Sequence, residues 1–255
     1  EITITAGATQ ALFTAITTFI KSGNEVIVIE PAYDSYGPSI EVCGGVVVPY
    51  EMKVPDFKID WNELEKLITS KTRMLIFNTP HNPTGSILLE NDLKTIERIA
   101  EENDLIVLSD EVYEHLIFDG EKHQSVLRFP KLFQRSLAVY SFGKTFHATG
   151  WKMGYCVAPE HLMREFRKVH QFNVFSVNSF VQQAIAEYLE DENTYLELNN
   201  FYQQKRDFFL EKIKNSKLRP LKCSGTYFQL VDYSEVSDED EFEFAKKMTI
   251  EYVVA

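Results

Sequence analysis

Short apolar runs alternate along most of the chain with longer segments in which apolar residues recur at helical spacing. The short runs are rich in Val and Ile and do not alternate strictly with polar residues, which indicates strands buried on both faces. Such strands, joined by helical crossovers, form a mainly parallel sheet. Strands are therefore predicted at residues 2–5, 25–29, 45–48, 74–77, 105–109, 137–141 and 155–158.

The segments between these runs have the features of crossover helices. "ATQALFTAITTFIKSG", residues 8–23, closes with Gly23, a residue favoured just after a helix end. "DWNELEKLI" begins at Asp60, a good N-cap residue, and has Glu63 three positions later, the spacing of a capping box. "ENDLKTIERIAEEND", residues 90–104, is a charged amphipathic helix.

Longer helical stretches replace this alternation after about residue 160, and they include "LMREFRKVH" and "NFYQQKRDFFLEKIKNS". A strand candidate, "GTYFQLVDY", and a helix from "DEDEFEFAKKM" follow. We therefore expect an α/β large domain over residues 1–160, a long connecting helical segment over 161–192, and part of a smaller α+β domain over 193–255. Because the chain opens on the strand-like "EITITAG", we also expect it to begin and end inside a larger fold.

Composition narrows the class of protein. The chain has 255 residues, 44% of them hydrophobic and 25% charged, which is typical of a soluble globular protein. Its 38 acidic and 26 basic residues give a net charge of −12, which argues against a nucleic-acid partner because phosphate binding needs a basic face. No apolar run approaches the roughly 20 residues of a membrane span. Cys43, Cys156 and Cys223 form no metal or disulfide pattern, which favours reduced thiols in a cytoplasmic protein.

Four segments carry candidate chemistry, and the first is "TAGATQAL". Here a predicted strand ends at Gly7, and a helix follows at once from Ala8 and Thr9. Free backbone N–H groups at a helix start, with a Thr hydroxyl beside them, can bind phosphate. An ordinary strand-to-helix turn explains the same residues.

The second segment is "TPHNPTG", residues 79–85, which follows a predicted buried strand. In an open α/β sheet the loops after the carboxyl ends of the strands are where ligands bind. Asn82, held between two prolines, is well placed to donate a hydrogen bond there. The alternative is a plain proline-rich turn.

The third segment, "LIVLSDEVYEHLIF", places Asp110 at the end of a strongly apolar strand, with Tyr113 three residues later. A buried carboxylate is costly unless it meets a cation or a protonated heterocycle. Asp110 could equally cap a short helix, and Tyr113 could be an ordinary core residue.

The fourth segment, "SFGKTFHATGWKMG", follows another predicted strand. Lys144 in a glycine-bounded turn can act as an amine nucleophile. Ser141 and Lys152 can offer a hydroxyl and a cation to a phosphate. Taken alone, two solvated surface lysines explain this segment as well.

The four segments gain weight together because each follows a predicted strand, and one sheet would bring them to one edge. They supply an anion cradle, an amide donor, an acid, a phenol and an amine nucleophile. That combination suits pyridoxal phosphate.

The chain resembles the fold-type I pyridoxal-phosphate aminotransferases of class I/II, in particular the kynurenine aminotransferase and glutamine transaminase K branch and the bacterial methionine aminotransferases. The motifs that carry the resemblance run in order along the whole chain: "GATQALFTAI", "EPAYDSY", "NTPHNPTG", "SDEVYEHLIF", "SFGKTFHATGWKMGYCVAP", "RKVHQFNVFSVN", "FYQQKRD" and "GTYFQLVDY". Two family features are missing from it: a segment before "EITITAG", and an Arg beyond "IEYVVA" that binds the substrate carboxylate.

The resemblance implies a role for each candidate residue. Lys144 would bind the cofactor covalently and later move a proton, and Asp110 would pair with the pyridine nitrogen. Asn82 and Tyr113 would hydrogen-bond the ring oxygen, with Asn82 also near the substrate carboxylate. The remaining cofactor contacts would be Tyr33 stacked on the ring, and Ala8, Thr9, Ser141 and Lys152 around the phosphate. Three further residues, His81, His147 and Tyr36, would at best line the site.

The resemblance also implies a reaction: ping-pong transfer of an amino group from methionine, an aromatic amino acid or a glutamine-like donor to a 2-oxo acid, by a cytoplasmic homodimer. Two alternatives share the fold. A carbon–sulfur β-lyase would use the same Lys144 and Asp110 with a different bond broken. The sensor domain of a transcription regulator would need a DNA-binding module, and this acidic chain shows none.

Overall fold

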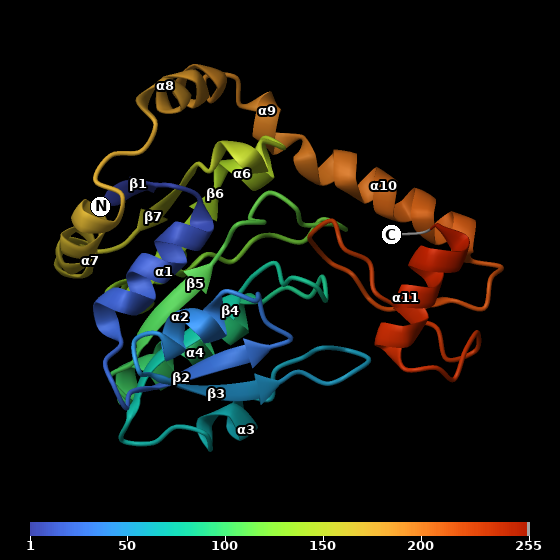
Figure 1. The fold of residues 1–255 in the computed structure, drawn as a ribbon, viewed down its shortest axis with the longest axis horizontal. Coiled ribbons are helices and arrows are strands. Elements are labelled where there is room, and N and C mark those ends of the chain that lie inside the picture. Colours follow the sequence, from blue (N-terminus) through green and yellow to red (C-terminus); the bar gives the residue numbers. More distant parts are fainter. Residues whose placement is uncertain (254–255) are drawn as a thin grey trace.

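The computed structural model describes residues 1–253, and its centre is a seven-stranded sheet (Figure 1). The strand order is β1-β7-β6-β5-β4-β2-β3. Strands β3, β2, β4, β5 and β6 run parallel, whereas β7 is antiparallel to both β6 and β1. The strands are β1 (Ile2–Thr5), β2 (Glu25–Glu30), β3 (Val46–Glu51), β4 (Thr72–Asn78), β5 (Ile106–Asp110), β6 (Ser136–Ser141) and β7 (Gly154–Val157).

All seven predicted strands of the sheet are confirmed, with shifts at their ends. The largest shift concerns β3, which runs to Glu51 rather than residue 48 because it continues to pair with β2 as far as Glu30. The mainly parallel α/β class is confirmed as well. The antiparallel direction of β7 matters for the site, since it brings the residues before Gly154 to the edge where the parallel strands end.

Helices cover both faces of the sheet. The main helices are α1 (Ala8–Phe19), α2 (Tyr36–Glu41), α3 (Trp61–Glu65), α4 (Glu90–Glu102), α5 (Pro130–Phe133), α6 (Phe142–Thr145), α7 (Glu160–Asn173), α8 (Ser179–Tyr188), α9 (Asn193–Leu196), α10 (Leu198–Ile213) and α11 (Glu241–Tyr252). Two 3-10 turns, η1 (Val126–Arg128) and η2 (Thr149–Trp151), complete the set described.

The core forms two apolar layers, one on each side of the sheet. Val26 and Val28 of β2 pack with α1, α2 and α7, whereas Ile27 and Ile29 of the same strand pack with α4. Successive side chains of a strand point to opposite faces, so a run of four apolar residues serves both layers. This arrangement explains why the strands lack the polar alternation of a half-exposed sheet.

Two helix ends differ from the sequence prediction. Helix α1 ends at Phe19, and Gly23 lies in a separate turn at φ 81°, where its N–H donates to Gly44 O. Asp60 does cap α3 by accepting from the N–H groups of Asn62 and Glu63. The Glu63 side chain pairs with Lys66 instead of returning to the cap, so only half of the predicted capping box forms.

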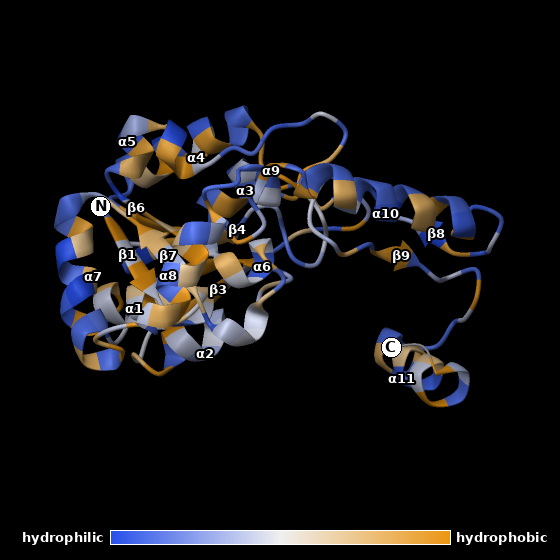
Figure 2. Ribbon diagram, turned by 90° about the horizontal axis from the view of Figure 1, so that it is seen from above, coloured by the Kyte–Doolittle hydropathy of each residue, from blue (hydrophilic) through white to orange (hydrophobic). Residues whose placement is uncertain are grey.

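The last third of the described chain is mostly helical. A break at residues 174–178 separates α7 from α8, and α10 leads to a two-stranded ladder of β8 (Arg219–Pro220) and β9 (Val231–Asp232). The predicted strand at 225–233 is therefore wrong over most of its length, and only β9 and a single bridge between Gly225 and Ile117 form. Figure 2 shows α11 set apart from the sheet, beyond β9. The proposed domain boundaries remain a prediction.

Two further expectations concern the chain as a whole. Over residues 1–253, none of the helices has the length and apolar character that crossing a membrane requires. The three cysteines are free thiols, as expected, but only Cys156 and Cys223 are buried, and Cys43 is partly exposed.

Candidate active site

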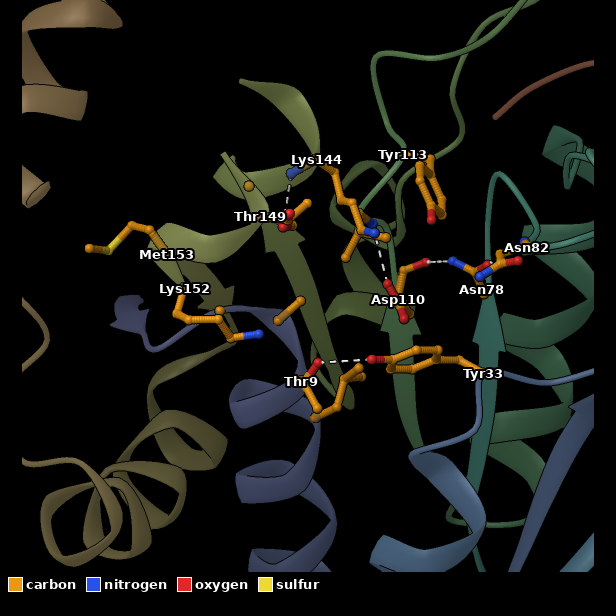
Figure 3. A pocket seen from close by; sticks show the side chains of 16 residues that line it. Thr9, Tyr33, Asn78, Asn82, Asp110, Tyr113, Lys144, Thr149, Lys152 and Met153 are labelled. Carbon is orange, nitrogen blue, oxygen red and sulfur yellow. Dashed lines mark hydrogen bonds between the residues drawn. The ribbon is translucent and has the colours of Figure 1, made fainter. Parts of the chain in front are cut away.

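A pocket lies at the edge of the sheet where the parallel strands end (Figure 3). All nine residues expected around the cofactor line it, although they come from six separate parts of the chain. In Figure 3, Lys152 and Thr9 lie toward one end, Asn82 and Tyr113 toward the other, and Asp110 between them. The full lining is Gly7, Ala8, Thr9, Leu12, Tyr33, Asn78, Asn82, Asp110, Val112, Tyr113, Ser141, Gly143, Lys144, Thr149, Lys152 and Met153.

One end of the pocket is built to receive an anion. Helix α1 begins there after Gly7, whose φ of 82° is a conformation that favours glycine, and within residues 1–253 no side chain caps this helix. The N–H groups of its first turn therefore lack intrahelical acceptors. Lys152 lies beside them, so close that a Cβ on Gly7 would meet the Lys152 Cε at 3.5 Å. A helix start with a lysine beside it can bind a phosphate.

The strands behind this end of the pocket approach each other closely because of Gly154. A Cβ on this residue would lie 2.6 Å from Tyr140 O and 2.9 Å from the N–H nitrogen of Ala8. Only glycine lets β7 pack against β6 and the start of α1 at that distance. Gly154 therefore holds the helix start and Lys152 in one place, a role that the sequence alone did not reveal.

Ser141 and Thr9 also reach this end of the pocket. The Ser141 Oγ accepts a hydrogen bond of 3.2 Å from the Lys144 N–H and so caps α6. The Thr9 hydroxyl lies 3.2 Å from the Tyr33 hydroxyl, which ties the start of α1 to the loop before α2.

Asp110 is the buried acid of the site. It ends β5, is only 4% exposed, and accepts hydrogen bonds from the Tyr36 hydroxyl at 2.6 Å and the Val112 N–H at 3.3 Å. Burial raises the pKa of Asp110 to about 6, and the bond from Tyr36 opposes that rise. Burial also raises the pKa of Tyr36 well above its ordinary value, so its phenol stays protonated and donates. Both donors are neutral, so the carboxylate favours a cationic partner.

Asn78 links Asp110 to the loop that carries Asn82. Its side-chain nitrogen donates to Asp110 O at 2.8 Å, and its side-chain oxygen accepts from the Asn82 N–H at 2.7 Å. The peptide bonds before Pro80 and Pro83 are both cis. Asn82 is thus placed at the pocket wall by β4 and its following turn.

Lys144 lies on the short helix α6 and is partly buried. Its Nζ donates a hydrogen bond of 3.1 Å to the Tyr227 hydroxyl and stands 5.8 Å from the centre of the Tyr113 ring. The Tyr113 hydroxyl lies 3.4 Å from that of Tyr227. Burial raises the pKa of Tyr113, which therefore remains a neutral phenol at ordinary pH.

Three residues in the motifs were expected at best to line the site, and the structure places them outside the pocket lining. Tyr36 nonetheless contributes to the site, because its hydroxyl donates a hydrogen bond to the Asp110 carboxylate. His81 is buried and its Nδ1 lies 2.9 Å from the Thr84 hydroxyl; burial lowers its pKa to about 4. His147 bonds through Nε2 to the Tyr202 hydroxyl at 2.8 Å.

Sequence reasoning missed Asn78, Tyr227 and the function of Tyr36. Asn78 directly precedes "TPHNPTG", so its place at the carboxyl end of β4 was a signal that could have identified it. Tyr36 and Tyr227 lie within two of the quoted motifs but reach the site only through tertiary contacts. Nothing in their local sequence indicates those contacts.

The groups present fit pyridoxal phosphate. The helix start and Lys152 match its phosphate, and buried Asp110 matches a protonated ring nitrogen. Lys144 supplies an amine, and its Nζ lies 5.8 Å from the centre of the Tyr113 ring. Over residues 1–253 no group of three or more His, Cys, Asp or Glu side chains is arranged to hold a metal ion.

Comparisons with known proteins agree with this geometry. The family model "Aminotransferase class I and II" matches residues 1–255. Methionine aminotransferase of Escherichia coli strain K12 is 48% identical over 256 residues, covering 100% of this chain and 66% of that protein. Human kynurenine–oxoglutarate transaminase 1 is 33% identical over 254 residues, covering 92% of this chain and 60% of that protein.

Solved structures give the same result. An Escherichia coli protein with a methionine aminotransferase function superposes with a TM-score of 0.98 at 47% identity, over 100% of this chain and 68% of that one. Aromatic aminotransferase from Pyrococcus horikoshii OT3 superposes with a TM-score of 0.93 at 34% identity, over 100% and 69%. The chain thus spans about two thirds of the length of these relatives. The resemblance seen in the motifs is confirmed, and the chain belongs to the aminotransferase class I and II family.

Proposed function

We propose that the full-length protein is a pyridoxal-phosphate-dependent aminotransferase that moves an amino group from an amino acid to a 2-oxo acid by a ping-pong mechanism. The observation that carries this proposal is the convergence of Lys144, buried Asp110 and the start of α1 on one pocket. Family membership supports it, since enzymes of this family use pyridoxal phosphate. When bound, this cofactor supplies an electron sink for the bond broken at the substrate α-carbon.

Each of the pocket residues has its own role in the proposed reaction. Lys144 supplies the amine that attaches covalently and then carries a proton to and from the substrate α-carbon. Asp110, held by Tyr36, keeps a proton on the ring nitrogen by its negative charge. The Tyr113 hydroxyl and the Asn82 amide would hold the ring oxygen, and Asn82 would also contact the substrate carboxylate. Tyr33 would cover the ring face, and Ala8, Thr9, Ser141 and Lys152 would bind the phosphate.

For the amino donor we propose methionine, an aromatic amino acid or a glutamine-like amino acid. The support is the 48% identity to a methionine aminotransferase and the kynurenine and aromatic enzymes among the relatives. Tyr113, Tyr227 and Phe228 form an aromatic cluster beside Lys144, which suits an apolar substrate side chain. We also propose that the protein acts in the cytoplasm as a homodimer, as the family resemblance implies.

The test is amino transfer by the purified full-length protein. Methionine, phenylalanine and glutamine are each offered with a 2-oxo acid, and the new amino acid is measured. Transfer from at least one donor, abolished in Lys144→Ala, is the expected result. Release of pyruvate and ammonia from cystathionine without a 2-oxo acid, and no transfer from any donor, would instead indicate a carbon–sulfur β-lyase.

A further inference from the structure

The amine of Lys144 is held by a residue from a distant part of the chain. Lys144 Nζ donates to the Tyr227 hydroxyl at 3.1 Å, and the two residues are 83 positions apart. The same hydroxyl lies 3.4 Å from that of Tyr113. The Lys144 amine and the hydroxyls of Tyr227 and Tyr113 therefore form a continuous chain of polar groups, of which Lys144 and Tyr113 line the pocket.

Tyr227 is fixed in place by the backbone of its segment. The N–H of Ser224 donates to Gly85 O at 2.8 Å, and the N–H of Thr226 donates to Leu116 O at 3.0 Å. Thr226 is fully buried and has a φ of 67°, the left-handed region that a β-branched residue rarely adopts. Such a conformation persists only where the surrounding structure holds it. The surrounding backbone contacts therefore fix the turn that directs Tyr227 toward Lys144.

Tyr227 is 38% exposed, and its ring is contacted by neighbouring aromatic rings. It meets the Tyr113 ring edge to face at 5.3 Å and lies 4.8 Å from the Phe228 ring. A lysine, in contrast, has a flexible four-carbon stem and loses much rotamer freedom when its amine is held in one place. A rigid phenol is a suitable group to hold it.

We propose that Tyr227 is a positioning residue for Lys144: it holds the free amine beside Tyr113, in place to attach to the cofactor. This inference rests on the proposed function. It also makes cofactor attachment depend on the segment around residues 223–228. This segment belongs to the C-terminal part of the chain, whereas Lys144 lies on α6, directly after strand β6 of the sheet. The hydroxyl of Tyr227, not its ring, is the group that acts.

The test measures how fast cofactor-free full-length protein attaches pyridoxal phosphate. In this step the neutral Lys144 amine condenses with the aldehyde carbon, which forms a C=N bond and releases one water. Borohydride added at timed intervals donates hydride to that bond and gives a stable secondary amine, which mass spectrometry locates at Lys144. Tyr227→Phe keeps the ring and removes the hydroxyl that accepts from Lys144 and contacts the Tyr113 hydroxyl, so the rate is expected to fall about threefold to tenfold.

Tyr202→Phe is the matched control. Its ring lies 5.7 Å from that of Tyr227, but its hydroxyl bonds to His147 and not to Lys144. The attachment rate of this variant should equal that of the unmodified protein. Tyr227→Leu serves as a second variant without the hydroxyl, and thermal unfolding of each variant shows whether it is folded.

Pyridoxal, which lacks the phosphate, separates an effect on the lysine from one on the phosphate cradle. The fall in Tyr227→Phe should be as large with pyridoxal as with pyridoxal phosphate. An unchanged or faster rate in the folded variant, or a fall seen only with pyridoxal phosphate, would overturn the inference. If the unmodified protein is not labelled at Lys144 at all, the proposed function itself fails.

Discussion

The Tyr36 hydroxyl donates a 2.6 Å hydrogen bond to Oδ2 of Asp110, and both side chains are buried. The bond joins α2, on one face of the sheet, to the carboxyl end of β5. It helps to keep a buried carboxylate partly ionised, since the hydrogen bond from Tyr36 lowers the pKa that burial raises, as do the Val112 N–H and the charge of Lys144. The acid of the site is therefore tuned by a residue that does not line the pocket.

Removal of that hydroxyl should weaken cofactor binding. Tyr36→Phe keeps the ring but leaves Asp110 with one donor fewer, so its pKa rises above about 6. A carboxylate that takes up a proton near neutral pH cannot pair with a protonated ring nitrogen. We expect about a tenfold weaker affinity for pyridoxal phosphate at pH 7, the range expected for a hydrogen bond to a charged group.

Equilibrium dialysis of the full-length variant at several pH values checks this prediction. The loss of affinity should be largest at pH 6 to 7 and smaller at pH 9, where Asp110 is ionised in both proteins. A loss that is the same at every pH would mean that Tyr36 acts by packing alone. Tyr50→Phe is a suitable control, since the Tyr50 hydroxyl accepts from the Asp60 N–H far from the pocket.

Asp110 should lower the stability of the cofactor-free protein. Its pKa is raised from 3.8 to about 6, so between these values the folded state holds a proton that the unfolded state has lost. Stability therefore falls as the pH rises through this window, and above it the ionised group costs about 3 kcal/mol. Asp110→Asn should recover up to this amount at pH 7.5 and nothing at pH 4, while abolishing amino transfer.

Urea unfolding of the cofactor-free protein at these two pH values measures the effect. The gain in unfolding free energy must grow with pH over the window between about pH 4 and pH 6. A variant that is less stable than the unmodified protein at pH 7.5 would show that the carboxylate is not under the burial penalty inferred from the structure.

Lys152 should contribute to phosphate binding and to nothing else. It lies at the uncapped start of α1, so Lys152→Gln removes a positive charge from that end of the pocket. We expect about a tenfold or greater loss of affinity for pyridoxal phosphate, the size typical of one charge-assisted bond, and no change for pyridoxal. Isothermal titration with both ligands measures it. Lys21→Gln, at the opposite end of α1, is the control and should change neither value.

Gly154 should not tolerate a side chain. A Cβ there would lie 2.6 Å from Tyr140 O and 2.9 Å from the Ala8 nitrogen, so Gly154→Ala must push β7 away from β6 or from α1. The expected cost is about 1–3 kcal/mol of unfolding free energy, together with weaker phosphate binding. Gly37→Ala is the control because a Cβ at Gly37 meets nothing within 4 Å. Equal stability of the two variants would contradict the close approach seen at Gly154.

The strands and most of the pocket could be predicted from the sequence because their signals are local. Val26 to Ile29 is an apolar run long enough to serve both layers, and it formed the strand expected. Lys144, Asp110 and Asn82 each follow such a run, and the rule for parallel sheets brings them to one edge. The pocket lining confirms that placement, while the chemical roles given to these residues stay predictions.

What the sequence could not reveal depends on long-range packing. Apolar residues at 155–158 read the same in either strand direction, so the antiparallel course of β7, which brings Lys152 to the pocket, was not foreseeable. The segment at 225–233 has strand-like residues, but its first backbone N–H groups, those of Gly225 and Thr226, donate to Gly85 O and Leu116 O instead of to a neighbouring strand. The contacts of Tyr36 and Tyr227 likewise depend on segments brought together only by the fold.

The role of Lys144 is tested most directly by the visible absorbance of the full-length protein with its cofactor. In the unmodified protein, the band of the lysine-bound cofactor should disappear when methionine or another accepted donor is added, and return when a 2-oxo acid is added. Lys144→Ala should lack this band and both changes. A Lys144→Ala protein that shows the same band and the same response to donor and acceptor would contradict the account.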